Sequence, residues 1–271
     1  MTAPDSYSGS HLDAHFAPLS ADDVWHEVLI APRRMQVVPP ELQLIERSGW
    51  VQRITPTFVR GAGVNSVDLA VIAEHEVDRV IDETIAMYRA IGCELRWLVG
   101  PDSAPADLAT RLARRGLKRT EVSGMALATS GWDPAPPNPD ITVERVDAAS
   151  LDEFAEVMVE GWGDNIPARR ALYAQAAASD HEQLYLARYR GEPAAGGSQA
   201  LYPRSAYFHA GVVLPQFRAH GIYRALVDAR VAAAAACGKP IVTTHARLDS
   251  SAPRLEHMGF REVVRMVSFR G

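Results

Sequence analysis

The sequence predicts an α/β protein built from two similar halves. Four prolines fall within residues 130–140, near the middle of the 271-residue chain, and proline continues neither a helix nor a central strand. Short apolar runs alternate with amphipathic helical patterns after this segment, and a weaker copy of that alternation precedes it. These observations predict a domain at residues 1–130, a proline-rich linker at 131–140 and a second domain at 141–271.

The second half is expected to run in the order β-α-α-β-β-β-α-β-α-β. Residues 141–146 alternate in the manner of a strand. Asp147 then supplies an N-cap for a helix whose apolar stripe contains Leu151, Phe154, Val157 and Met158. The remaining expected elements are helices at 167–178, 221–236 and 253–258 and strands at 183–189, 194–201, 207–214, 240–246 and 261–269.

The first half repeats the end of this order. Its expected elements are strands at 65–72, 94–99 and 120–128 and helices at 74–90 and 105–115. Short landmarks recur at matching places, because Gly92 and Gly238 each precede a strand. Gly116 and Gly259 likewise each follow a helix. Either an internal duplication or a chance coincidence of such short landmarks explains this repetition, and we expect a duplication.

Composition excludes several classes of function. The net charge is −5 and the pI is near 6.0, whereas a nucleic-acid-binding protein concentrates basic residues. The two cysteines, Cys93 and Cys237, are too few for a disulfide framework, and no histidine pair has metal-ligand spacing. Residues 1–11 lack the features of a signal peptide, and no apolar run is long enough to cross a bilayer. We therefore expect a cytoplasmic protein that binds no metal, nucleic acid or membrane.

One segment of the second half has the pattern of an anion site. The strand that ends at Leu214 is followed by Pro215, and a helix is expected to begin near Gly221. The first backbone N–H groups of a helix have no intrahelical partner, and they lie at the positive end of its dipole. A diphosphate is a suitable ligand for such a turn. Arg218 and Arg224 add positive charge around it.

This turn resembles the acyl-CoA pyrophosphate loop of the GCN5-related N-acetyltransferase (GNAT) superfamily. That loop is usually written Q/R-x-x-G-x-G/A, and the chain reads Arg218-x-x-Gly221-Ile222-Tyr223 at this place. Tyr223 stands where a small residue is usual. A second landmark of the superfamily, a Gly-Phe between a short helix and a final strand, resembles the Met-Gly-Phe that ends at Phe260.

The resemblance implies a fold class and a substrate. It implies an α/β (α+β) protein with two GNAT-like domains, each a mixed, mostly antiparallel twisted sheet flanked by helices. In the second domain two strands splay apart at the acyl-CoA site, and acetyl-CoA or another acyl-CoA is the implied co-substrate. The first half lacks the loop, because residues 73–76 read Ala-Glu-His-Glu, and acidic side chains repel a diphosphate. The first domain is therefore expected to be a degenerate copy without a cofactor site.

The resemblance also assigns cofactor-binding residues. The backbone N–H of Gly211 would polarise the thioester carbonyl, where negative charge develops during acyl transfer. Val212 and Val213 would pair with the pantetheine arm. The loop residues implied to contact the phosphates are Arg218, Ala219, His220, Gly221, Ile222, Tyr223 and Arg224. Ser251, at the last helix, either bonds the cofactor or caps that helix.

Catalytic residues are expected on the strand that precedes the loop. The residues that strand alternation predicts on one face are Tyr207, His209, Gly211 and Val213. His209 has the ionisation range of a general base, although a packed or solvent-facing histidine fits the pattern as well. Tyr207, at a position that resembles the catalytic glutamate of some GNAT enzymes, would orient the substrate or a water. The tyrosine that usually serves as general acid is replaced by Leu255, which cannot donate a proton.

The predicted activity is transfer of an acetyl or short acyl group from acyl-CoA to an amine of a small-molecule acceptor, by direct attack in a ternary complex. Glu160 and Asp164 lie in the region that lines acceptor sites in GNAT proteins. They would bind a cationic amine or would simply form a solvated helix end. Two alternatives keep the fold: decarboxylation or hydrolysis of an acyl thioester, and a non-catalytic acyl-CoA-binding module. A monomer and a homodimer are both compatible with the sequence.

Overall fold

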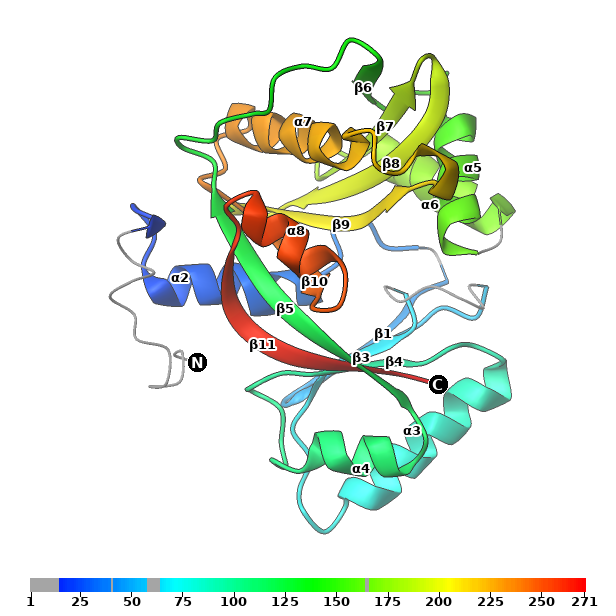
Figure 1. Ribbon diagram of the computed structural model, residues 1–271. Helices are drawn as coiled ribbons and strands as arrows, with labels where there is room; N and C mark the ends of the chain where they lie inside the picture. Colours follow the sequence, from blue (N-terminus) through cyan, green and yellow to red (C-terminus); the bar gives the residue numbers. More distant parts are fainter. Residues whose placement is uncertain (1–14, 40, 58–63, 164–165) are drawn as a thin grey trace. The chain divides into compact units, whose positions relative to one another are not determined.

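Two compact units make up the chain in the computed structural model, which describes residues 15–39, 41–57, 64–163 and 166–271 (Figure 1). Unit 1 takes its described residues from 1–37 and 126–245, and unit 2 takes its described residues from 38–125 and 246–271. Each unit contains strands, helices and a hydrophobic core of its own.

Unit 1 is built on a mostly antiparallel sheet. Its strands stand in the order β10-β9-β8-β7-β6, and only the β9–β10 pair is parallel. The strands are β6 (Ile141–Arg145), β7 (Glu182–Tyr189), β8 (Glu192–Leu201), β9 (Ser205–Val213) and residues 241–245 of β10 (Ile241–Arg247). Helices α5 (Leu151–Trp162) and α6 (Ile166–Ala177) follow β6, and α7 (Ile222–Ala236) connects β9 to β10.

Helices cover both faces of this sheet (Figure 1). Gly196 and Gly197 are neighbours in β8, so they face opposite sides. A Cβ added to Gly196 would lie 2.7 Å from the sulfur of Met158 on α5, and one added to Gly197 would lie 3.1 Å from a guanidinium nitrogen of Arg230 on α7. Helices α5 and α7 therefore lie against opposite faces, and the two glycines let both approach β8 closely.

Strand β7 shows how the sequence fills both layers. Leu184 and Leu186 pack in the same cluster as Phe154 of α5, whereas Tyr185 packs in the cluster of Leu226 of α7. All five side chains are buried. A strand that is covered on both faces has this continuous apolar run, because successive side chains enter opposite layers.

The N-terminal segment of unit 1 is helical, which was not predicted. It contains α2 (Ala21–Trp25), a π-helical turn (His26–Ile30) and a 3₁₀ turn (Ala31–Arg33). The buried carboxylate of Glu27 accepts a hydrogen bond from the Ser205 hydroxyl at 2.5 Å and one from Arg204 Nε at 3.1 Å. These bonds anchor the segment at the start of β9.

Unit 2 has a sheet in the order β1-β2-β3-β4-β11-β5. The strands are β1 (Gln43–Arg47), β2 (Trp50–Ile54), β3 (Ser66–Ala70), β4 (Arg96–Val99), β11 (Arg261–Arg270) and residues 118–125 of β5 (Lys118–Ala128). Helix α3 (Val77–Ile91) connects the parallel strands β3 and β4, and α4 (Leu108–Arg114) and α8 (Ser251–His257) complete the unit. Trp97 and Tyr88 are fully buried in its core, and the Trp50 ring meets the Trp97 ring edge-on with centroids 5.7 Å apart.

The compact units divide the chain differently from the predicted linear boundaries. Strand β11 forms an antiparallel ladder with β4 that pairs Ser268 with Leu98, and Phe269 packs in the same core as Trp97. Residues 246–271 therefore belong to unit 2, whereas they were predicted in the second domain. Residues 15–37 and the proline-rich segment at 131–140 belong to unit 1.

Asp147 forms a turn before α5 and does not cap the helix as predicted. The residue at the N-cap position is Ser150. Asp147 Oδ1 instead accepts the backbone N–H groups of Ala149 at 2.9 Å and Ser150 at 3.0 Å. These bonds, with that of Ser150 the largest, hold the pKa of the Asp147 carboxyl below its usual range.

The recurring glycines all adopt a left-handed backbone conformation, Gly238 in unit 1 and the other three in unit 2. Gly92 and Gly238 follow α3 and α7 with φ angles of 73° and 69°. Gly116 and Gly259 follow α4 and α8 with φ angles of 79° and 94°. Glycine reaches this left-handed region without the clash that a Cβ introduces, so it commonly ends helices. The matching positions support an internal duplication.

Candidate functional site

Strand β9 contains a β-bulge near its middle. Its ladder with β8 pairs Val212 with Gly196 and His209 with Ser198, so three steps along β9 match two along β8. Ala210 has a φ angle of 52° at this point. A bulge adds one residue to a strand and reverses the alternation of the residues beyond it.

The bulge overturns the prediction that Tyr207, His209, Gly211 and Val213 share one face. A Cβ added to Gly211 would lie 3.7 Å from Arg230 Nη2 of α7, and Val213 packs in the cluster of Leu226 of α7. His209 instead bonds Glu182, which shares the α5 side of β7 with Leu184 and Leu186 by alternation. Gly211 and Val213 therefore face α7, opposite to His209.

Strands β9 and β10 part at the bulge. Their parallel pairing runs from Ser205 to Phe208 of β9, where Phe208 is matched with Thr244. The Thr244 hydroxyl donates to the Phe208 carbonyl at 3.0 Å at this last pair. Among the described residues, residues 209–213 of β9 pair with β8 and with no other strand. This leaves the second half of β9 with an open edge.

Backbone N–H groups of β9 point toward that open edge. Leu214 N–H donates to the Ala194 carbonyl of β8 at 2.9 Å. Successive residues of a strand direct their N–H groups to opposite sides. The N–H groups of Val213 and Gly211, one and three residues before Leu214, are therefore directed away from β8. The edge that β10 leaves open thus presents amide donors.

The chain turns from β9 into α7 through two left-handed residues. Residues Pro215–Phe217 form a 3₁₀ turn, Ala219 has a φ angle of 67°, and Gly221 has a φ angle of 84° at the N-cap. No side chain caps the helix, and its first backbone bond runs from Ala225 N–H to Gly221 O at 3.1 Å. A Cβ at Gly221 would meet nothing within 4 Å, so conformation rather than crowding requires glycine there.

The cationic side chains of the turn have different partners. Arg218 is exposed, and its Nε approaches the Val213 carbonyl at 3.4 Å. The exposed His220 ring stacks on Tyr189, with ring centroids 4.5 Å apart.

The Arg224 side chain is bound to the proline-rich segment and to α7. Its Nε lies 2.9 Å from Asp228 Oδ1, and its Nη2 donates to the Asp133 carbonyl at 2.6 Å. Its guanidinium also covers the Trp132 ring, 4.7 Å from the centroid. The Tyr223 ring lies near Gly211, 3.9 Å from the position of an added Cβ. The loop therefore offers backbone amides, Arg218 and His220.

A histidine–carboxylate pair lies on the other face of β9. His209 Nε2 is 3.1 Å from Glu182 Oε2, and the side chains are 36% and 9% exposed, respectively. A carboxylate only accepts, so this bond assigns the proton to Nε2 and leaves Nδ1 as an acceptor. The Tyr207 ring stacks on His209, with centroids 6.0 Å apart and planes 17° from parallel. Sequence reasoning missed Glu182, which is brought near His209 by the register of two strand pairs.

Ser251 and Leu255 are in unit 2, where the Ser251 hydroxyl accepts Arg247 N–H at 3.0 Å and Leu255 is buried. Ser251 does not cap α8, because the N-cap residue is Ser250 and the Ser251 hydroxyl accepts from a residue that precedes the helix. Glu160 is exposed and accepts from Gln216 at 3.4 Å, and Asp164 lies outside the described residues.

The part of the chain that the structure describes holds no group of three or more His, Cys, Asp or Glu residues that could bind a metal ion. In that same part, no helix has the length and apolar character needed to cross a membrane. Cys93 and Cys237 are free thiols.

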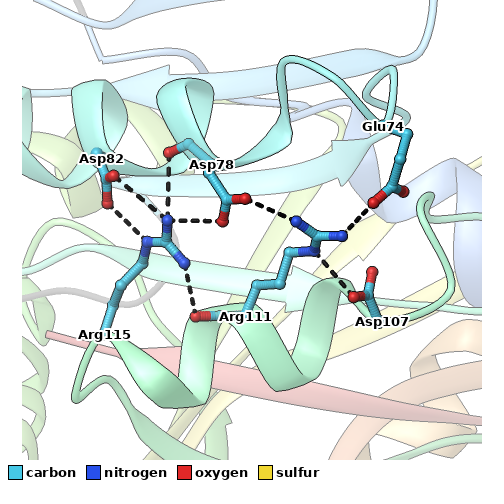
Figure 2. Close-up of polar contacts among 6 residues, drawn as sticks. All are labelled: Glu74, Asp78, Asp82, Asp107, Arg111 and Arg115. Atoms are coloured by element: carbon cyan, nitrogen blue, oxygen red, sulfur yellow. Dashed lines mark hydrogen bonds and ion pairs between the residues drawn. The ribbon is translucent and has the colours of Figure 1, made fainter.

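The corresponding turn of unit 2, between β3 and α3, is occupied by ion pairs. Figure 2 shows Arg111 of α4 and Arg115, which directly follows α4, pointing toward carboxylates at the start of α3. Arg111 binds Glu74, Asp78 at 2.7 Å and Asp107 at 2.9 Å, and Arg115 binds Asp78 at 2.8 Å and Asp82 at 2.6 Å.

Comparison with known proteins adds a match in fold. No protein-family model matches this sequence, and no curated protein matches it. A functionally unknown conserved protein from Staphylococcus epidermidis ATCC 12228 has a similar structure, with a TM-score of 0.67, 11% identity, and coverage of 88% of this chain and 94% of that one. A GCN5-related N-acetyltransferase from Kribbella flavida has a TM-score of 0.61 and 15% identity, over 85% of this chain and 89% of that one. A tandem GNAT protein from the clavulanic acid biosynthesis pathway has a TM-score of 0.56 and 16% identity, over 94% and 97%.

The fold is therefore that of the GCN5-related N-acetyltransferases. More particularly, the match to the tandem GNAT protein covers nearly all of both chains, so the chain has two GNAT-like domains in a tandem architecture. The predicted fold class and the resemblance on which it rests are confirmed. At these identities the similarity concerns the fold, and function is argued from the site itself.

Proposed function

We propose that unit 1 is an N-acyltransferase that transfers an acetyl or short acyl group from acyl-CoA to an amine of a small-molecule acceptor. One observation carries this proposal: β9 leaves β10 at a bulge and then turns into an uncapped helix N-terminus. An open strand edge suits the amides of the pantetheine arm, because they can extend the ladder. A helix N-terminus suits the diphosphate.

The turn into α7 fits a diphosphate in two respects. Gly221 has open space around its Cα, so an anion can approach the backbone there. Arg218 and His220 are exposed beside it. The proposed contacts of the turn are the backbone N–H groups of residues 218–224 together with these two side chains. Arg224 would contribute through its backbone alone, because Asp228 and the Asp133 carbonyl hold its guanidinium.

The open edge of β9 would position the reacting group. Val212 and Val213 would line the pantetheine arm, and Gly211 N–H would donate to the thioester carbonyl oxygen. Acyl-CoA supplies an activated carbonyl carbon, which bonds to the amine nitrogen as the bond to sulfur breaks and CoA leaves as a thiol. A fixed N–H donor at the carbonyl oxygen stabilises the negative charge that develops there.

His209 would act as the general base. Its Nδ1 would take the proton that the amine loses, directly or through a water, and solvent would return a proton to the departing sulfur. Glu182 fixes the tautomer of His209 through Nε2 and would stabilise the positive imidazolium, as a buried carboxylate does in other histidine–carboxylate pairs. Tyr207 restricts the rotation of the His209 ring by stacking.

Binding and turnover test the proposal separately. We expect calorimetry to give a dissociation constant for CoA below about 1 mM, and a weaker affinity would contradict the cofactor site. Incubation with acetyl-CoA and a panel of amines should release thiol, measured with a colorimetric reagent, and should yield an acylated amine by mass spectrometry. A control without amine separates transfer from hydrolysis, because hydrolysis releases thiol in both reactions.

A further inference from the structure

Arg230 lies beneath the bulge of β9. It projects from α7 and is only 2% exposed. Its Nη1 donates to the Ser198 carbonyl of β8 at 3.3 Å, and its Nε donates to the Leu226 carbonyl of its own helix at 3.2 Å. The guanidinium carbon is 4.3 Å from the centroid of the Phe208 ring. The group is thus held by one strand, one helix and one aromatic face.

Two glycines make room for this guanidinium on either side of the bulge. A Cβ added to Gly197 would lie 3.1 Å from Nη1, and one added to Gly211 would lie 3.7 Å from Nη2. Gly197 is the residue of β8 that the bulge leaves between the pairs of Gly196 and Ser198. The charged end of Arg230 therefore packs directly against the part of β9 that carries the Gly211 amide.

The positive charge of Arg230 has no carboxylate partner among the residues that the structure describes, since no ion pair includes it there. Its hydrogen-bond acceptors are neutral carbonyls. Burial lowers the pKa of the guanidinium to about 10, which leaves it protonated at neutral pH. A buried, uncompensated cation is costly, so its place beside a proposed reaction centre calls for an explanation.

We infer that Arg230 is a positioning residue that holds the bulge of β9 and places positive charge behind the oxygen that Gly211 N–H would bind. This inference rests on the proposed function. In a site of low dielectric a fixed charge a few ångströms away favours the developing negative oxygen, and it needs no reorganisation during the reaction. Phe208 and the two glycines fix the guanidinium in place.

The charge can be separated from the packing by three substitutions. R230K keeps a positive charge near the bulge but loses the planar group. R230M removes the charge and keeps most of the apolar length. R230Q also removes the charge and keeps a donor for the Ser198 carbonyl, so it serves if R230M does not fold. Circular dichroism and the melting temperature establish which variants are folded.

Infrared difference spectroscopy of acetyl-CoA with a ¹³C carbonyl, bound to the full chain, tests the inference without an acceptor. We expect the bound carbonyl stretch to lie at lower frequency than that of free acetyl-CoA in water, because the site polarises the bond. R230K should keep most of this shift, whereas R230M and R230Q should lose at least half of it. Once an acceptor is known, the neutral variants should lower kcat by about 10- to 100-fold with a nearly unchanged KM for acetyl-CoA.

Two outcomes separate the inference from the proposed function. If the wild-type chain does not bind acetyl-CoA in calorimetry, both are overturned. If the wild-type chain binds it and folded R230M or R230Q retains the full carbonyl shift, the charge is irrelevant and only the inference is overturned. R79Q serves as a control, because it removes an exposed cation of α3 in unit 2 and should leave the carbonyl frequency unchanged.

Discussion

The two strand–helix turns, β9–α7 in unit 1 and β3–α3 in unit 2, share a backbone plan but differ in what fills them. Both follow the first strand of a parallel pair, and both lead into a helix that ends at a left-handed glycine region. In unit 1 the strand edge beyond the last pair is open. In unit 2 Ala104 N–H donates to Ala70 O at 2.9 Å, and Ile72 N–H donates to Ala104 O at 3.0 Å. The edge that would receive a pantetheine arm is therefore covered in unit 2 by its own chain.

The N-termini of α7 and α3 also differ in whether charged side chains of the same unit surround them. The start of α7 has left-handed Ala219 and Gly221 beside exposed Arg218. The start of α3 carries Glu74 and Asp78, which Arg111 binds (Figure 2). Carboxylates near a helix N-terminus satisfy the dipole that a bound anion would otherwise satisfy. Under the proposed function, the turn of unit 1 binds an anion, whereas the turn of unit 2 holds ion pairs.

Substitution of His209 should have the largest effect on turnover, because it removes the proposed general base. Only unit 1 is proposed to contain such a base. We expect H209A to lower kcat by about 100-fold or more, with little change in CoA affinity. Steady-state thiol release and calorimetry measure the two quantities. H245Q is the matched control, because His245 Nε2 already bonds the Val28 carbonyl at 2.8 Å. Equal losses in both variants would assign no special role to His209.

Gly221 tests whether the left-handed turn itself binds CoA. An L-residue at a φ angle of 84° is strained by about 1–2 kcal/mol, so G221A should destabilise the fold by that amount. The competent loop is then less populated, and CoA should bind about 10-fold more weakly. G238A is the control: Gly238 has a φ angle of 69° and open space around it, and it lies at the other end of α7. If both variants bind CoA alike, the turn is not the cofactor site.

Local sequence patterns predicted the ranges of most helices and strands, but they did not predict which strands pair with each other. The strands and helices from 65 onward follow periodicity and glycine or proline punctuation, and each falls near its predicted range. The capping box of Ser20 and Asp23 before Val24 and Trp25 is a local signal that could have revealed α2. The pairing of β11 with β4 has no such local signal, because the sequence of a strand does not determine which strand lies next to it in the sheet.

The sequence predicted the turn between β9 and α7, but it did not predict which residues share a face of β9. Glycine at 221 is the residue that a left-handed N-cap favours, so the turn is visible in the sequence. Ala210 is not a residue typical of φ 52°, and the bulge that it forms reversed the expected side of Gly211. Glu182 reaches His209 only through the registers of β7 with β8 and of β8 with β9. Such registers depend on the assembled sheet.

Arg218 offers a smaller effect that sharpens the electrostatic difference between the turns. R218A should weaken CoA binding by about 5-fold, and the loss should shrink at high salt because an exposed charge is screened. Calorimetry at two salt concentrations measures both. R79A is the control, since Arg79 on α3 is an exposed cation paired with Glu76 and Glu83 in unit 2. A salt-independent loss, or an equal loss in R79A, would place the phosphates elsewhere.

Acid unfolding gives the smallest effect and examines the ion pairs at the start of α3. The hydrogen bond from Arg115, followed by the charges of both arginines, holds the pKa of Asp78 below its ordinary 3.8. A depressed folded pKa means that the pair stabilises the fold above the ordinary value and ceases to do so as pH falls through the folded one. D78N should therefore lower the melting temperature of the chain slightly at pH 7, by less than a buried pair would, because these groups are exposed. The wild-type and D78N curves should converge below pH 3.8. A difference that persists into stronger acid would mean that Asp78 acts through packing at the start of α3 rather than through its charge.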